Sequence, residues 1–209
     1  MSSVSLRTEP LRRRCRPEDP HLIAVCALLL LGAGWAGPAP RAGTPDQPFS
    51  EHEVEAAFLY HFTKYIEWPP QVFASAQSSI VLGFLGSDPF RGAVEEVIEG
   101  RLVDGRSLLW RRFDQPPKGG EGHVLFIGSD DEARMKQALA RLRTEPVLTV
   151  GDSEAFGRAG GIVWFRVTGN RVRFAINIDA ARRAGLQISS RLLGVATVVG
   201  DGDVGVDRE

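Results

Sequence analysis

The side chains that could do chemistry in this chain are few, and the first of them is a serine. Gly151-Asp152-Ser153 follows an apolar run, where a serine could lie exposed as a nucleophile. Such a serine needs a histidine base. In hydrolases with this tripeptide the base comes later in the chain, whereas the last histidine here, His123, comes earlier. We therefore expect Asp152 and Ser153 to cap the segment that follows, or to bind a ligand there, rather than to catalyse.

Metal and cofactor signatures are missing from the sequence. Beyond residue 42 the histidines are His52, His61 and His123, and no HExxH motif or cysteine cluster accompanies them. No GxGxxG occurs in a dinucleotide-binding setting, and GxxxxGK[ST] is absent. We expect no metal, no cofactor and no enzymatic activity. A formal charge of −1 also argues against a nucleic-acid partner.

A second chemical feature is a pair of arginines on a predicted β-hairpin. Gly169-Asn170 suits a two-residue loop, and this loop places Arg166 opposite Arg173. The apolar pairs on the other face are Val167–Val172, Phe165–Phe174 and Val163–Ile176. Because opposed like charges destabilise a sheet unless an anion lies between them, the arginines are either solvated or part of a binding site. Trp164 and Asn177 share their face, which we predict to be exposed, and both are candidate binding residues.

The elements that position these residues alternate between strands and helices. Residues 79–86, 123–128 and 146–150 are short apolar runs, typical of strands buried on both faces. Helices are predicted from Ser50, from Asp88 to about Glu99, and from the Ser129 to Glu132 capping box to about Arg143. This order predicts an α/β domain with a largely parallel or mixed sheet and flanking helices. A C-terminal β-hairpin and an apolar closing helix complete it.

The predicted strands end in similar turns, FLGSD, FIGSD and TVGDS. Parallel strands joined by right-handed crossovers bring such turns to one edge of the sheet, where open α/β sheets bind their ligands. Gly-Ser-Asp is also good capping chemistry, so a ligand site and simple capping both explain the pattern.

The amino terminus has the pattern of a secretion signal. Four arginines within residues 12–16 precede an apolar stretch between His21 and Trp35, and small residues follow up to Ala42. We predict a signal peptide at 1–42, a linker at 43–49, the α/β domain at 50–200 and an acidic flexible tail at 201–209, with the product in the periplasm. A retained membrane anchor is the alternative. Cleavage after Ala42 would remove six Lys/Arg and three Asp/Glu, leaving a formal charge of −4.

Two separated segments carry a resemblance to a known family. AAFLYHFTKYIEWP at Ala56–Pro69, and LTVGDSEAF, GGIVWF and VRFAINIDAARRAGLQISSRLL further on, together resemble the YfiR/HmsC-like family of small periplasmic proteins. The likeness covers about Glu51 to Gly200.

The resemblance implies a periplasmic regulator that represses an inner-membrane diguanylate cyclase by binding its periplasmic domain, in cyclic-di-GMP and biofilm control. The disulfides of YfiR-type members have no counterpart, since Cys15 and Cys26 both lie in the predicted signal peptide. A periplasmic small-molecule (anion) binding or sensor protein is the alternative function. A homodimer is a further possible assembly.

Overall fold

The computed structural model describes residues 50–128, 130–169 and 171–203. These residues belong to one of two compact units of the chain, Asp46–Glu209. The other unit, Met1–Pro45, lies outside the described residues, as do the whole predicted signal peptide and linker.

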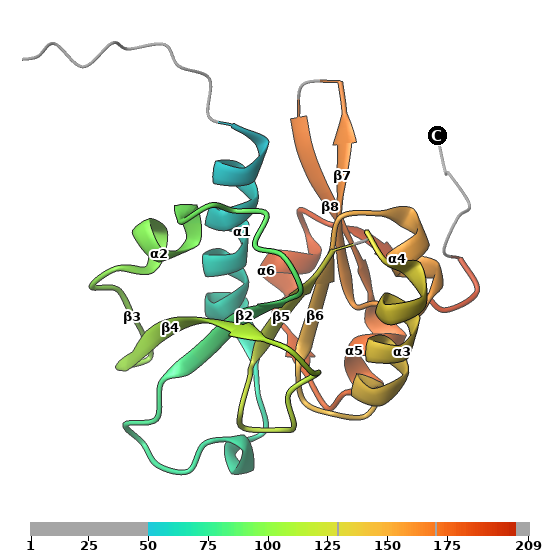
Figure 1. Ribbon diagram of the computed structural model, residues 1–209. Coiled ribbons are helices and arrows are strands. Elements are labelled where there is room, and N and C mark those ends of the chain that lie inside the picture. The colour runs from blue at the N-terminus through green and yellow to red at the C-terminus, as the bar shows by residue number, and fades with distance from the viewer. Residues whose placement is uncertain (1–49, 129, 170, 204–209) are drawn as a thin grey trace, which may run out of the picture. The chain divides into compact units, whose positions relative to one another are not determined.

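A mixed sheet of eight strands in the order β10-β8-β7-β6-β5-β2-β4-β3 organises the domain (Figure 1). Its five central strands are parallel. They are β4 (Arg106–Phe113), β2 (Ile80–Leu85), β5 (Val124–Ile127), β6 (Leu148–Gly151) and β7 (Val163–Thr168). At one edge β8 (Arg171–Asn177) runs antiparallel to β7, and β10 (Thr197–Val199) runs parallel to β8. At the other edge β3 (Leu102–Val103) pairs antiparallel with β4. The predicted α/β class is confirmed.

Helices cover both faces of this sheet and divide the core in two. The first core contains α1 (Glu51–Tyr65), α2 (Ala93–Ile98), α5 (Ile178–Arg183) and α6 (Ser190–Leu193), and the second contains α3 (Glu132–Leu142) and α4 (Glu154–Arg158). Every residue of β2, β5 and β6 is buried, as expected for apolar runs that have a helix layer on either side. A short pair, β1 (Ile66–Glu67) with β9 (Gln187–Ile188), and a 3-10 turn at Pro70–Val72 complete the structure.

The capping box predicted for α1 holds, since Ser50 and Glu53 form it. The box predicted from Ser129 to Glu132 was wrong, because α3 begins at Glu132 and is capped by Asp131, whose side chain accepts the Arg134 N–H. The turns after β2, β5 and β6 lie at one edge of the sheet, since these strands are parallel neighbours.

Three predicted elements were wrong. The helix expected from Asp88 begins only at Ala93, after Gly92 at φ +94°, because the Asp88 side chain accepts the Phe90 N–H and closes a separate turn. The apolar closing helix ends at Leu193, and β-branched residues 197–199 pair with β8 as a strand instead. The sequence also favours Asp179 as the cap of the short helix after the hairpin, but the cap of α5 is Asn177.

The buried side of α1 agrees with the sequence pattern only in part. The pattern predicts a stripe through Val54, Ala57, Phe58, Phe62, Tyr65 and Ile66, of which Phe62 and Ile66 are buried. The other buried side chains of α1 are Glu55, Ala56, Leu59, Tyr60 and Thr63. Apolar residues occur nearly all round this helix, so periodicity alone leaves its rotation undetermined.

Candidate functional site

The β7–β8 hairpin has the predicted register. Phe165 pairs with Phe174 and Arg166 with Arg173. Both phenylalanines are 3% exposed and contact the Phe62 ring of α1, with centroids 6.1 and 5.2 Å away. The apolar face of the hairpin is thereby fixed to the first core.

The prediction that Trp164 lies on an exposed face was wrong, because its side chain is only 1% exposed. Gly157 of α4 packs so closely that a Cβ there would lie 2.9 Å from the Trp164 ring. Helix α4 therefore covers this face at the base of the hairpin. Trp164 supports the hairpin from inside and is not available to a partner.

The two arginines lie beyond the part of the hairpin that α4 covers. Arg166 Nε is 2.7 Å from Glu154 Oε1, and both side chains are about one-third exposed. Arg173 is exposed. The carboxylate that an opposed arginine pair requires is thus supplied by Glu154 of the chain itself, which removes the reason to expect an external anion at this place.

Asp152 and Ser153 lie at the carboxyl end of β6. The Ser153 hydroxyl accepts the Phe156 N–H at 3.2 Å and caps α4, as the sequence predicts. Asp152 is exposed. A crevice of about 110 Å³ lies at the same edge, between the ends of β2 and β5. It is smaller than the ~300–1,000 Å³ usual for small-molecule sites.

Sequence reasoning missed Glu55, a carboxyl group buried among the apolar side chains of α1. Burial raises its pKa from 4.5 to about 7, and the nearby charges of Glu51 and Asp152 act in the same direction. His52 Nδ1, 3.4 Å away, partly opposes the shift. The signal was present, since Glu55 precedes Leu59 and Phe62 by four and seven residues and so shares their helical face.

His123 is a packed core histidine. Its Nδ1 accepts the Val81 N–H at 3.0 Å, and its ring stacks on Phe73 with centroids 4.7 Å apart. Burial, helped by the charge of Arg106, lowers the pKa of His123 to about 4. No group of three or more possible metal ligands occurs within the described residues.

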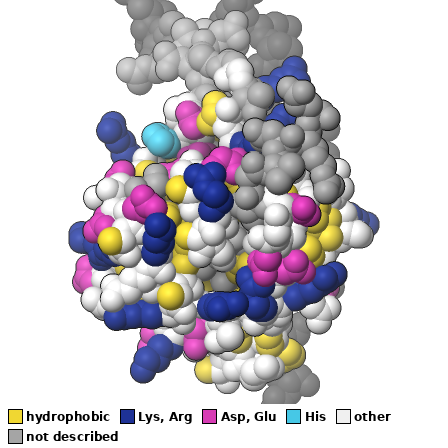
Figure 2. Space-filling view, turned by 90° about the vertical axis from the view of Figure 1, so that its right-hand side faces the viewer, with side chains coloured by type: hydrophobic (Ala, Val, Ile, Leu, Met, Phe, Trp, Pro, Cys, Tyr) yellow, Lys and Arg dark blue, Asp and Glu magenta, His cyan; other side chains and the backbone are white. Residues whose placement is uncertain are grey.

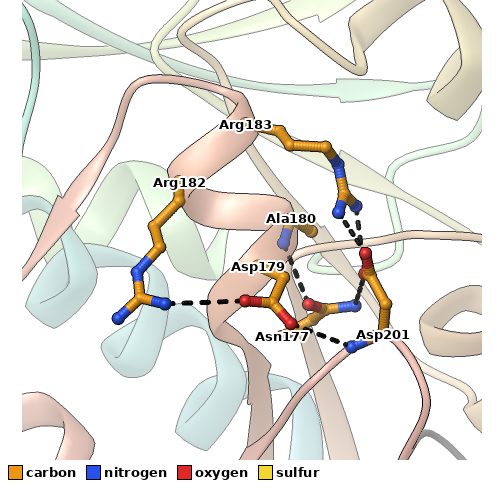
Figure 3. Close-up of polar contacts among 6 residues, drawn as sticks. All are labelled: Asn177, Asp179, Ala180, Arg182, Arg183 and Asp201. Carbon is orange, nitrogen blue, oxygen red and sulfur yellow. Dashed lines mark hydrogen bonds and ion pairs between the residues drawn. The ribbon is translucent and has the colours of Figure 1, made fainter.

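Asn177 belongs to a polar cluster at the end of β8 (Figure 3). Its Oδ1 accepts the Ala180 N–H at 2.9 Å, and its Nδ2 donates to Asp201 Oδ1 at 3.0 Å. Arg183 donates to both carboxylate oxygens of Asp201. Asp201 was predicted to begin a flexible tail, yet it is fixed against the domain by these bonds. Asn177 is the last residue of β8 and lies four residues beyond Arg173 along that strand.

The chain matches a known protein family over most of the described domain. A family model described as YfiR/HmsC-like matches residues 52–197. The chain belongs to the YfiR/HmsC-like family. The match begins in α1 and ends in β10, so it includes the hairpin, the buried Glu55 and Asn177. Within the described residues, no helix has the length and apolar character needed to cross a membrane.

Proposed function

We propose that this YfiR/HmsC-like protein is a periplasmic regulator that binds the periplasmic domain of an inner-membrane signalling protein and represses it. The partner best suited to this role is a diguanylate cyclase, so that loss of the regulator raises cyclic-di-GMP. The observation that carries the proposal is the family match over residues 52–197, since this family is regulatory rather than catalytic. The secretion pattern of residues 1–42 supports the location.

The outer half of the β7–β8 hairpin is the surface proposed for partner binding. In Figure 1 the hairpin extends beyond the helices that flank its base. Arg171 and Arg173 are exposed on one face of this outer half, and Val167, on the opposite face, is 53% exposed. Arginine is enriched at protein interfaces and at their hot spots. We expect an acidic patch on the partner.

A double change tests this surface. Arg166→Ala with Arg173→Ala should leave the domain folded, because the Phe165–Phe174 pair on the opposite face is untouched, and should weaken capture of the partner domain at least ~10-fold. Arg111→Ala with Arg112→Ala is the matched control, since these arginines are exposed on β4, at the far side of the sheet. Equal binding by both variants would exclude the hairpin surface.

The regulatory role has a separate test in the producing cell. Deleting the gene should raise cyclic-di-GMP and surface attachment, and a copy encoding the wild-type chain should restore both. Unchanged cyclic-di-GMP after deletion would rule out a cyclase as the partner. The alternative function, anion binding, has no support left at the arginine pair, but it has support elsewhere in the domain.

A further inference from the structure

A cavity of about 430 Å³ lies between α3, the end of α4, α5 and the turn after β10. Its volume falls within the range of small-molecule sites, ~300–1,000 Å³, and is about four times that of the crevice at the sheet edge. Figure 2 shows the side of the molecule on which α3 and α4 lie, and Lys and Arg side chains are numerous on it.

Positive charge dominates the lining of this cavity. Lys136, Arg143, Arg158 and Arg183 line it together with one carboxylate, Asp201. Lys136 pairs with Glu132 one turn earlier on α3, and Arg183 pairs with Asp201. Within the described part of the chain Arg143 and Arg158 are in no ion pair, but each lies near enough to a carboxylate, Asp201 and Glu132 respectively, to help lower its pKa. Four cations and these two carboxylates leave an excess of two positive charges around the same space.

The helix dipoles explain some of the cationic side chains that line the cavity, but not all of them. Arg158 and Arg183 lie in the last turns of α4 and α5, where a cation interacts favourably with the helix dipole. That interaction acts at each helix end separately and is satisfied on an open surface. It does not account for the convergence of cationic side chains from three helices on one concave space. A concave cationic surface concentrates anions.

The cavity wall already binds a carboxylate, that of Asp201. Asp201 Oδ1 accepts from Asn177 Nδ2 at 3.0 Å and from Arg183 Nη2 at 3.1 Å, and Oδ2 accepts from Arg183 Nη1. The Arg183 bonds, and then that of Asn177, hold the pKa of Asp201 below its usual value. Asn177 is only 1% exposed and is fixed by its bond to Ala180. The wall is therefore built around an anion, and the guanidinium fork of Arg183 is of the kind that matches carboxylate and phosphate oxygens.

We propose that this cavity binds a small organic dianion, a phosphate monoester or a dicarboxylate. Arg143 and Arg158 hold its charged group, and Lys136 adds a further donor. The Asp201–Arg183 pair forms the adjoining wall, and Leu139 and Ala159 offer a small apolar surface to the rest of the ligand. Two charges on the ligand balance the excess of two positive charges around the cavity. The inference rests on this geometry alone and holds whether or not the chain regulates a cyclase.

Calorimetric titration of the protein, purified from cells that express the full chain, tests the proposal. The probes are sn-glycerol 3-phosphate and succinate, with glycerol and acetate as neutral and monoanionic controls. We expect at least one dianion to bind with one-to-one stoichiometry and at least ~10-fold more tightly than acetate. If one dianion binds, its charged group, phosphate or carboxylate, is the one that the cavity recognises. If both bind, the cavity recognises two negative charges rather than a particular group.

Arg143→Gln with Arg158→Gln should weaken the dianion at least ~10-fold and leave the circular dichroism spectrum unchanged. The matched control, Arg111→Gln with Arg191→Gln, removes two exposed arginines away from the cavity and should bind as the wild type does. The proposal is overturned if neither dianion binds, if the cavity variant binds as tightly as the wild type, or if both variants lose affinity equally.

Discussion

Replacing Glu55 by glutamine should stabilise the domain, and increasingly so as the pH rises. The Glu55 side chain is 5% exposed, and its pKa rises from 4.5 to about 7 on folding. Between these two values the folded state binds more protons than the unfolded state. The free energy of unfolding therefore falls as pH rises through this range, and above pH 7 the whole cost of ionising a buried carboxyl is present.

The size of the effect follows from the pKa shift. One pKa unit corresponds to about 1.4 kcal/mol, so the wild type loses up to about 3 kcal/mol between pH 4.5 and pH 8. Glutamine has nearly the same shape and cannot ionise, and it keeps an oxygen that can face His52. We expect Glu55→Gln and the wild type to be equally stable at pH 4.5, and the variant to be more stable at pH 8 by up to about 3 kcal/mol.

Urea unfolding of both proteins at pH 4.5, 6 and 8 measures this difference. Comparing the two chains is essential because His123 acts in the opposite sense. Its pKa is lowered to about 4, so its contribution is complete above about pH 6.5 and is lost as the pH falls toward 4. Both chains contain His123, so its contribution cancels when the free energy of unfolding of one chain is subtracted from that of the other. Glu96→Gln, an exposed site on α2, is the control and should show no pH-dependent difference. A constant difference at all three pH values, or a less stable Glu55→Gln at pH 8, would refute the burial argument.

Three further outcomes are expected. Phe165→Ala or Phe174→Ala should lower the free energy of unfolding by ~3–5 kcal/mol, measured in urea, whereas a loss near zero would mean that this face does not form core. Asn177→Ala removes both the α5 cap and the Asp201 contact and should destabilise by ~1–2 kcal/mol, with no effect if water replaces both bonds. Mass spectrometry of the envelope protein should show a terminus between Ala36 and Ala42, and an intact Met1 would contradict the predicted signal.

The parts of the fold that the sequence predicted are those set by local chemistry. The hairpin register followed from Gly169-Asn170 and the two-residue alternation, because a slip of one residue would have exposed Phe165 and Phe174. The cap formed by Ser153 followed from its side chain alone. The three buried strands were predicted from short apolar runs. Such a run has no polar face that could be exposed to water, so both of its faces must be covered.

The errors concern contacts between distant segments. The alternation of side chains along β7 placed Trp164 and Arg166 correctly on the same face. Nothing in the sequence of the strand shows that α4 buries Trp164 and leaves Arg166 partly exposed. The cationic cavity was invisible for the same reason, since Lys136, Arg158 and Arg183 come from three helices whose packing no spacing rule gives. Glu55 was overlooked because apolar residues occur nearly all round its helix. The sequence pattern therefore does not show which side is buried, or that this carboxyl group lies on it.

Helix α4 links the surface proposed for the partner with the cavity proposed for the ligand. At its start Glu154 pairs with Arg166 of the hairpin, and at its end Arg158 lines the cavity. Gly157, in between, packs on the buried Trp164 ring. A helix of five residues is far too short to be stable on its own, so its position depends on its packing, in which Phe156 is buried in the second core. Because the hairpin pairs with α4 and α4 contributes to the cavity wall, the proposed ligand and the proposed partner would contact the same small helix.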